Sequence, residues 1–251
     1  MVMPEVPSIK DLRKIASKKS TNGFLNPMCD FLAFYPAKVF LYLPLNPVQI
    51  TVLWVVIKIV TALLLVRGGY WFTLISLSIF QLASILDGVD GIVARYRKDY
   101  SYNGVLLDYF GHYFCNSLLL VCLALGTFWE TGKVTVFVAG GVAAFFYLLA
   151  KAVTFNPTCW MSGPEQRKEV EHILYSTGFS VKAQEKGFLA MAGDFFLLDN
   201  PLNFMFWGVL LGQNEITLWV YAVLLAIEAG RRMIVQYLRI RKWEKGKKST
   251  S

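Results

Sequence analysis

Acidic side chains and a histidine recur at helical spacing within apolar sequence. Asp87 and Asp90 close one long apolar run, and Asp108 and His112 lie four residues apart in the next. Residues three or four positions apart share a face of an α-helix, so each pair forms a stripe along its helix. Packing of the two helices would bring three carboxylates and an imidazole together. Such carboxylates must be neutralised, most simply by a hard divalent cation.

Small residues and an arginine accompany the acidic stripes. Gly91 and Ala94 lie on the first stripe, and Gly104 begins the second helix. Because these positions have no bulky side chain, a large ligand such as a nucleotide can lie against the backbone. The guanidinium of Arg95 offers a rigid fork of donors that suits phosphate oxygens. A metal beside a phosphate-binding arginine indicates chemistry at phosphoryl groups.

The complete pattern is D-x-x-D-G-x-x-A-R, eight further residues, and G-x-x-x-D-x-x-x-H. It resembles the signature of the class I CDP-alcohol phosphotransferases (CDP-alcohol phosphatidyltransferases), which are integral membrane enzymes of phospholipid synthesis. Seven of the eight fixed positions match, at Asp87, Asp90, Gly91, Ala94, Arg95, Gly104 and Asp108. The eighth position, an Asp in the family, is His112. The resemblance is strong over about residues 45 to 115.

The resemblance implies a role for each matched position. One or two Mg²⁺ or Mn²⁺ ions would be held by Asp87, Asp90 and Asp108. The nucleotide of a CDP-linked donor would be bordered by Gly91, Ala94, Arg95 and Gly104. His112 would accept the proton of the attacking alcohol. Because relatives are commonly homodimers, we expect a homodimer.

The histidine at position 112 leaves three interpretations open. An imidazole has an unperturbed pKa of about 6.5, so it can serve as a general base at neutral pH. It is a poorer ligand than a carboxylate for Mg²⁺, which prefers oxygen. His112 is therefore either a natural alternative base, the mark of one weakened metal site, or a substitution that impairs catalysis.

A second match precedes the first confident span. Family members often carry P-N-x-x-T at this point, and Pro47 and Thr51 match while Val48 replaces the Asn. Thr51 faces the nucleotide in one interpretation and is an ordinary helix-start residue in the other.

The composition is that of a membrane protein with several spans. Hydrophobic residues make up 55% of the 251 residues and charged residues only 17%. We expect an all-α bundle of six transmembrane helices over residues 46–238, preceded by a basic and amphipathic juxtamembrane segment, 1–45, and followed by a basic tail, 239–251. The first four predicted spans are about 48–66, 71–96, 104–129 and 134–155, the last broken by Asn156-Pro157. The sixth is about 216–235.

Two features inside this bundle are harder to interpret. The fifth span, 187–213, is interrupted by polar residues, so either it is kinked or its first part lies in the membrane interface. Asn200-Pro201 is typical of a helix start within it. Lys58 and Glu228 both fall near the middle of the membrane, where a charge needs a partner, and we expect either a Lys58–Glu228 pair or two separate polar contacts.

The distribution of Lys and Arg predicts the orientation. Placing both termini, the motif loop and the 156–188 loop on one side gathers nearly all of the 25 basic residues there. The positive-inside rule makes that side cytoplasmic, so the acidic motif and both termini would face the cytoplasm. The basic ends would bind anionic lipids. The net charge of +8 is thus explained by topology and needs no nucleic acid.

These observations favour an enzyme that moves a substituted phosphate from a CDP-linked donor to an alcohol and releases CMP. By resemblance, CDP-diacylglycerol is the preferred donor, with transfer from CDP-choline or CDP-ethanolamine to a lipid alcohol as the alternative. A family member that binds metal and nucleotide without turnover is a further possibility. A transporter fits less well, because its acids would be spread through the membrane. The acidic residues could instead form a buried ion-pair network. This alternative fits poorly, because three acids beside one arginine leave an excess of negative charge.

Overall fold

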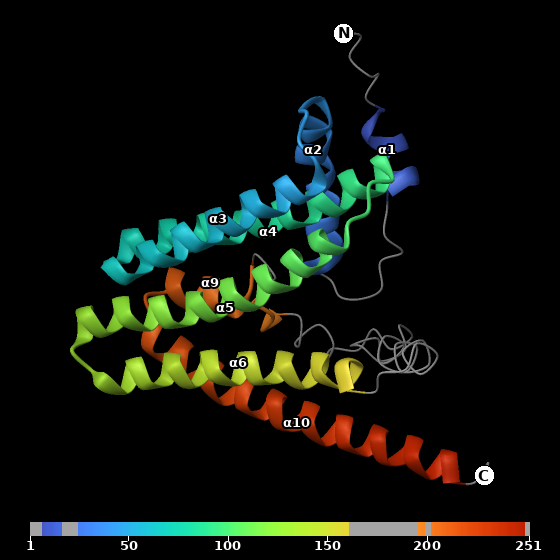
Figure 1. The fold of residues 1–251 in the computed structure, drawn as a ribbon. Coiled ribbons are helices and arrows are strands. Elements are labelled where there is room, and N and C mark those ends of the chain that lie inside the picture. Colours follow the sequence, from blue (N-terminus) through green and yellow to red (C-terminus); the bar gives the residue numbers. More distant parts are fainter. Residues whose placement is uncertain (1–6, 17–24, 161–194, 199–201, 249–251) are drawn as a thin grey trace.

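The computed structural model describes residues 7–16, 25–160, 195–198 and 202–248. Every regular element in this part of the chain is helical, as predicted. The bundle consists of α3 (Pro47–Leu64) with the 3-10 helix η1 (Leu65–Arg67), α4 (Tyr70–Arg97), α5 (Tyr102–Thr131), α6 (Val134–Trp160) and α10 (Asn214–Lys248). In Figure 1, α3 lies against α4 and α5, and α6 lies between α5 and α10.

Four of these helices are long and apolar enough to cross a membrane. They are α3 with η1, α4, α5, and α6 over Val134–Val153. Their outward faces carry exposed aliphatic side chains such as Val56 and Ile75, at 50% and 56% exposure. Apolar side chains on the outside of membrane-length helices are typical of a lipid-facing surface. The first four predicted spans are therefore present.

The predicted count of six spans is not confirmed by the described residues. The fifth predicted span is described only in part, and its regular element is the short helix α9 (Phe204–Leu210). Asn203 caps this helix, because its side chain accepts a hydrogen bond from the Phe206 amide at 3.0 Å. The helix start predicted at Asn200-Pro201 lies outside the described residues. So does most of the predicted 156–188 loop, whose first residues, up to Trp160, belong to α6.

The sixth predicted span lies within α10, which differs from the other long helices. It carries Glu228, Arg231 and Arg232 within its length, and α10 is not among the helices that qualify as spans by hydropathy. One boundary prediction was wrong: α6 does not end at Asn156-Pro157 but continues to Trp160. A proline near the end of a helix removes few backbone hydrogen bonds, so the last turn can still form.

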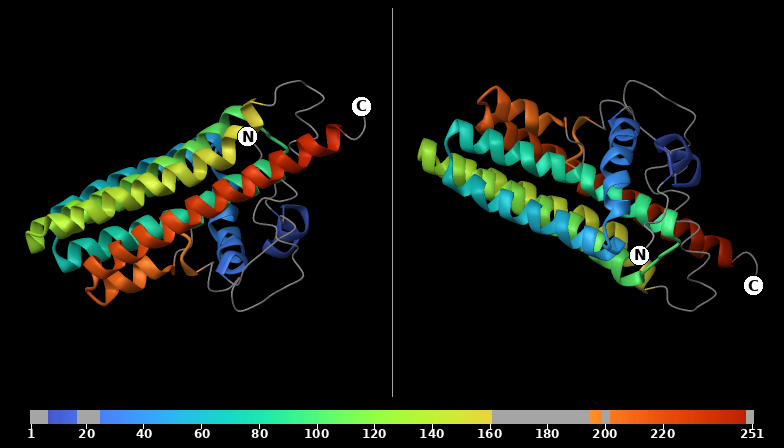
Figure 2. Two further views of the ribbon diagram at one scale, coloured as in Figure 1. Left: turned by 90° about the horizontal axis from the view of Figure 1, so that it is seen from below. Right: turned by 90° about the horizontal axis from the view of Figure 1, so that it is seen from above.

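One end of the bundle gathers the segments that matter for the site. Helix α2 (Leu25–Tyr42) lies across α4 at a steep angle, and α1 (Ile9–Ala16) lies beside both (Figures 1 and 2). The α4–α5 connection and the far end of α10 lie toward this same end, while the η1–α4 and α5–α6 turns lie at the other. The described parts of the segments predicted to share one side of the membrane are thus at the same end of the bundle.

Candidate metal and nucleotide site

The acidic motif lies on α4 and α5 where they meet the crossing helices. α4 remains helical through Arg97, and the next residue, Lys98, caps it in the left-handed conformation with φ of 55°. Ser101 then starts α5 by accepting a hydrogen bond from the Gly104 amide. The short connection returns the chain directly, so Asp108 and His112 lie beside the end of α4.

Asp87, Asp108 and His112 form a compact cluster between α4 and α5. The Nε2 atom of His112 lies 3.3 Å from an oxygen of Asp87 and 3.6 Å from an oxygen of Asp108. All three side chains are partly exposed, His112 least. The two predicted stripes therefore do meet, with the imidazole between the carboxylates.

Asp90 is held from the neighbouring helix α3. Its Oδ2 atom accepts hydrogen bonds from the Thr51 hydroxyl at 2.6 Å and the Trp54 indole N–H at 3.1 Å. Thr51 is buried and also donates to the Pro47 carbonyl at 3.1 Å. This contact with a motif carboxylate was not among the interpretations made from the sequence. These bonds fix the position of the Asp90 carboxylate beside the cluster.

Sequence reasoning missed Trp54. Besides its bond to Asp90, its ring centroid lies 5.2 Å from that of His112, so one side chain contacts both acidic stripes. The available signal was its spacing: Trp54 lies three residues after Thr51 and therefore on the same face of α3.

The residues predicted to border the nucleotide fall into two places. Arg95 lies against Gly91, where a Cβ atom would come within 3.0 Å of its Nη1. Its Nε donates to the Ala16 carbonyl at 2.7 Å, so it also contacts the end of α1. Gly104 instead packs beside Val48 of α3, since a Cβ there would lie 3.3 Å from Val48 Cγ2. Ala94 is partly buried on α4.

Of the two alternatives for Lys58 and Glu228, the structure does not form the pair. Glu228 binds two arginines of its own helix, Arg231 and Arg232, each at 2.7 Å. Lys58 is fully buried, and its Nζ atom has no hydrogen-bond partner among the described residues. Depth along a helix can be estimated from sequence, whereas the direction in which each residue points within the bundle depends on packing.

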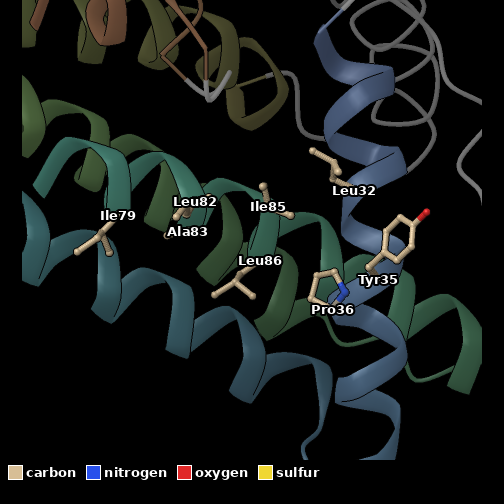
Figure 3. Close-up of a pocket in the computed structure, with 8 residues that line it drawn as sticks. All are labelled: Leu32, Tyr35, Pro36, Ile79, Leu82, Ala83, Ile85 and Leu86. Atoms are coloured by element: carbon tan, nitrogen blue, oxygen red, sulfur yellow. The ribbon is translucent and has the colours of Figure 1, made fainter. Parts of the chain in front are cut away.

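An apolar groove runs beside the acidic cluster, between α2 and α4. Its volume is about 460 Å³, and its lining, shown in Figure 3, comprises Leu32, Tyr35, Pro36, Ile79, Leu82, Ala83, Ile85 and Leu86. Leu86 directly precedes Asp87 on α4. The groove therefore lies on α4 over the turns that precede the acidic motif.

The cluster is suited to a divalent cation. Asp87, Asp108 and His112 each offer one ligand atom, and these atoms lie within 4.8 Å of one another. The two carboxylates carry charge that a cation would neutralise, and their oxygens are ligands that Mg²⁺ and Mn²⁺ prefer. The residues present thus fit a metal, with the imidazole as the least favourable ligand for Mg²⁺.

A bundle of membrane-length helices with carboxylates and an imidazole gathered at one end defines a multi-pass membrane protein with a candidate metal site. Residues 24–168, more than half of the chain, match the family model of CDP-alcohol phosphatidyltransferase. The chain belongs to this family of transferases of substituted phosphate groups, which confirms the resemblance seen in the motif. No curated protein matches the chain at a significant level.

Proposed function

We propose that the protein transfers a phosphatidyl group from CDP-diacylglycerol to an alcohol, with release of CMP. The observation that carries this proposal is the meeting of Asp87, Asp108 and His112 in a chain that belongs to the CDP-alcohol phosphatidyltransferase family. The acceptor oxygen would form a bond to the phosphorus that bears the lipid group. The bond from that phosphorus to the CMP oxygen would break.

His112 is the proposed general base. Its Nε2 atom would accept the proton of the acceptor hydroxyl, and the Asp87 and Asp108 oxygens near it would stabilise the imidazolium that forms. Thr51 and Trp54 would keep Asp90 aligned during the reaction. Gly91, Ala94 and Gly104 would leave room for the nucleotide, and Arg95 would bind its phosphates.

The proposed metal ligands are Asp87, Asp90 and Asp108, with Mg²⁺ or Mn²⁺ as the ion. When bound, a divalent ion would neutralise charge on the diphosphate and favour in-line displacement. Asp90 does not belong to the compact cluster of ligand atoms, so its participation would require its second oxygen or a change of rotamer.

The apolar groove supports a lipid substrate. Its lining would accommodate an acyl chain while the headgroup lies at Asp87. The proposal takes the lipid to be the donor. The alternative, a soluble CDP-choline or CDP-ethanolamine donor and a lipid alcohol acceptor, uses the same groove for the acceptor.

An acceptor that carries a phosphate group would need cations near the site to bind it. Lys151 of α6 lies over the rings of Tyr113 and Tyr147, with Nζ 5.4 Å and 5.2 Å from their centroids. Tyr113 follows His112 directly, so Lys151 lies close to the candidate site. Arg231 and Arg232 are engaged by Glu228. Arg167 lies outside the described residues.

The proposal also covers the orientation of the enzyme in the membrane, its lipid contacts and its oligomeric state. The site and both termini would face the cytoplasm, the basic ends would bind anionic lipids, and the protein would act as a homodimer. The distribution of basic residues supports the orientation. The homodimer rests on the resemblance alone.

The test is CMP release by the purified full chain in detergent with Mg²⁺ or Mn²⁺. CDP-diacylglycerol is compared with CDP-choline and CDP-ethanolamine across a panel of acceptors, for the parent chain, His112→Ala and His112→Asp. Activity in the parent with CDP-diacylglycerol that is lost in His112→Ala supports the proposal. Turnover only with the soluble donors establishes the alternative.

His112 favours one second candidate function, that of a family member that binds metal and nucleotide without turnover. In that case the parent binds CDP-diacylglycerol but releases no CMP, and His112→Asp restores release. A parent chain and a His112→Asp variant that both fail to bind donor and metal would refute both candidates.

A further inference from the structure

Arg97, in the last turn of α4, takes no part in the proposed reaction. Its guanidinium instead donates hydrogen bonds to three backbone carbonyls. Nη1 donates to Leu45, and Nη2 donates to Leu43 at 3.0 Å and to Leu41 at 3.3 Å. Leu41 lies in the last turn of α2, and the other two residues lie between α2 and α3. The last carbonyls of a helix lack partners within it, so Arg97 anchors the C-terminal end of α2 to α4.

Helix α2 also contacts α4 closely at the point where the two helices cross. A Cβ atom at Gly88 would lie 3.0 Å from the Cβ atom of Ala33, so the backbones approach each other there. Apolar packing around this point, for example by Phe34, is non-directional and leaves α2 some freedom to swing. Leu41 lies about 12 Å further along α2, at 1.5 Å per residue. Arg97 thus supplies a second attachment, and two attachments fix the direction of a helix.

The apolar groove depends on this direction, because its two sides are α2 and α4. Its lining from α2 consists of Leu32, Tyr35 and Pro36, which are close neighbours of Ala33 in the sequence. The lining from α4 lies in the turns that precede Gly88 (Figure 3). The groove is therefore a wedge that opens from the crossing point, and its width follows the angle between the two helices.

We propose that Arg97 is a positioning residue that sets the width of the groove and thereby the affinity for the lipid substrate. The three acceptors are backbone carbonyls, so Arg97 acts on the direction of α2 and not on the chemistry at the carboxylates. The proposal rests on the proposed function, because it takes the groove to hold an acyl chain. The planar fork of an arginine holds several carbonyls at once, whereas a lysine offers a single point charge.

Steady-state kinetics give the first test. The full chain is purified in detergent, and kcat and KM for CDP-diacylglycerol are measured by CMP release in mixed micelles. The variants are Arg97→Met and Arg97→Lys, with Arg67→Met as the matched control. Arg67 lies at the other end of the bundle, where its Cζ atom is 3.8 Å from the ring centroid of Phe72.

We expect Arg97→Met to raise KM about tenfold while kcat stays within about twofold of the parent, because binding is weakened without a change in the reacting groups. Arg97→Lys should lie between the parent and Arg97→Met, and Arg67→Met should match the parent. A merely structural role would lower the yield of folded protein and leave KM unchanged.

The direction of α2 is measured independently of activity. Spin labels are placed at Val39 of α2 and Ile75 of α4, which are 61% and 56% exposed, in a full chain whose four native cysteines are replaced by alanine. Double electron–electron resonance on labelled protein diluted with unlabelled protein gives the distribution of distances between the two labels. This distribution should be broader or shifted in Arg97→Met and unchanged in Arg67→Met.

Either an unchanged KM or an unchanged distance distribution in Arg97→Met would overturn the inference. If Arg97→Met does not fold, Arg97→Lys decides by the same criteria. A parent that releases CMP while the Arg97 variants match Arg67→Met loses only this inference. A parent that releases no CMP from any donor loses the proposed function, and the label distances then still decide whether Arg97 directs α2.

Discussion

The hydrogen bond from Thr51 to Asp90 gives a sharp test of how α3 supports the site. Thr51→Val keeps the shape of the buried side chain and removes the hydroxyl that donates to Asp90 Oδ2 at 2.6 Å. A hydrogen bond to a charged group contributes about 1.5–3 kcal/mol. If that energy serves to align Asp90 in the transition state, kcat/KM for CMP release should fall by about 10- to 100-fold.

Thr61→Val is the matched control for this substitution. Thr61 is also buried on α3, but its hydroxyl donates only to backbone carbonyls, those of Ile57 at 2.8 Å and Lys58 at 3.2 Å. Both variants should unfold at similar temperatures, and only Thr51→Val should lose activity. Equal kcat/KM values for the two variants would refute the idea that Thr51 aligns Asp90.

Three further substitutions test other contacts. Trp54→Phe keeps a ring beside His112 but removes the N–H that bonds Asp90, so kcat/KM should fall about tenfold; an unchanged value contradicts this role. Leu82→Glu places a charge in the apolar groove and should raise KM for the lipid substrate about tenfold in mixed micelles, with kcat maintained. Gly111→Val should lower stability by about 1–3 kcal/mol in thermal unfolding, because a Cβ there would lie 2.6 Å from α3 side chains, whereas Gly141→Val, with open space around it, should not.

The acidic cluster could be predicted because its geometry follows from helix periodicity. Asp108 and His112 are four residues apart, so they had to share a face of α5, and the short connection to α4 predicted that this face would lie near Asp87. The structure confirms that the stripes of Asp87 and His112 meet. The four apolar spans could also be predicted, since apolar runs of this length are typical of transmembrane helices.

The contacts made by α3 could not be predicted in the same way. Which side chains of α3 face α4 depends on the rotation of one helix against the other, and this is decided by packing along the whole interface. Thr51 and Trp54 therefore emerged as partners of Asp90 only from the structure. The same limitation explains why the sequence could not decide between a Lys58–Glu228 pair and separate contacts for the two residues.

The hydrogen bond from Arg95 to the Ala16 carbonyl ties the first described helix to the acidic motif. A chain shortened to remove α1, whether by proteolysis or by the choice of an expression boundary, would deprive the motif arginine of this acceptor. Low activity in such a shortened protein would then reflect a disturbed arrangement around Arg95 and would say nothing about the chemistry of the chain that retains α1. Purification tags and fluorescent fusions are for this reason better placed after α10.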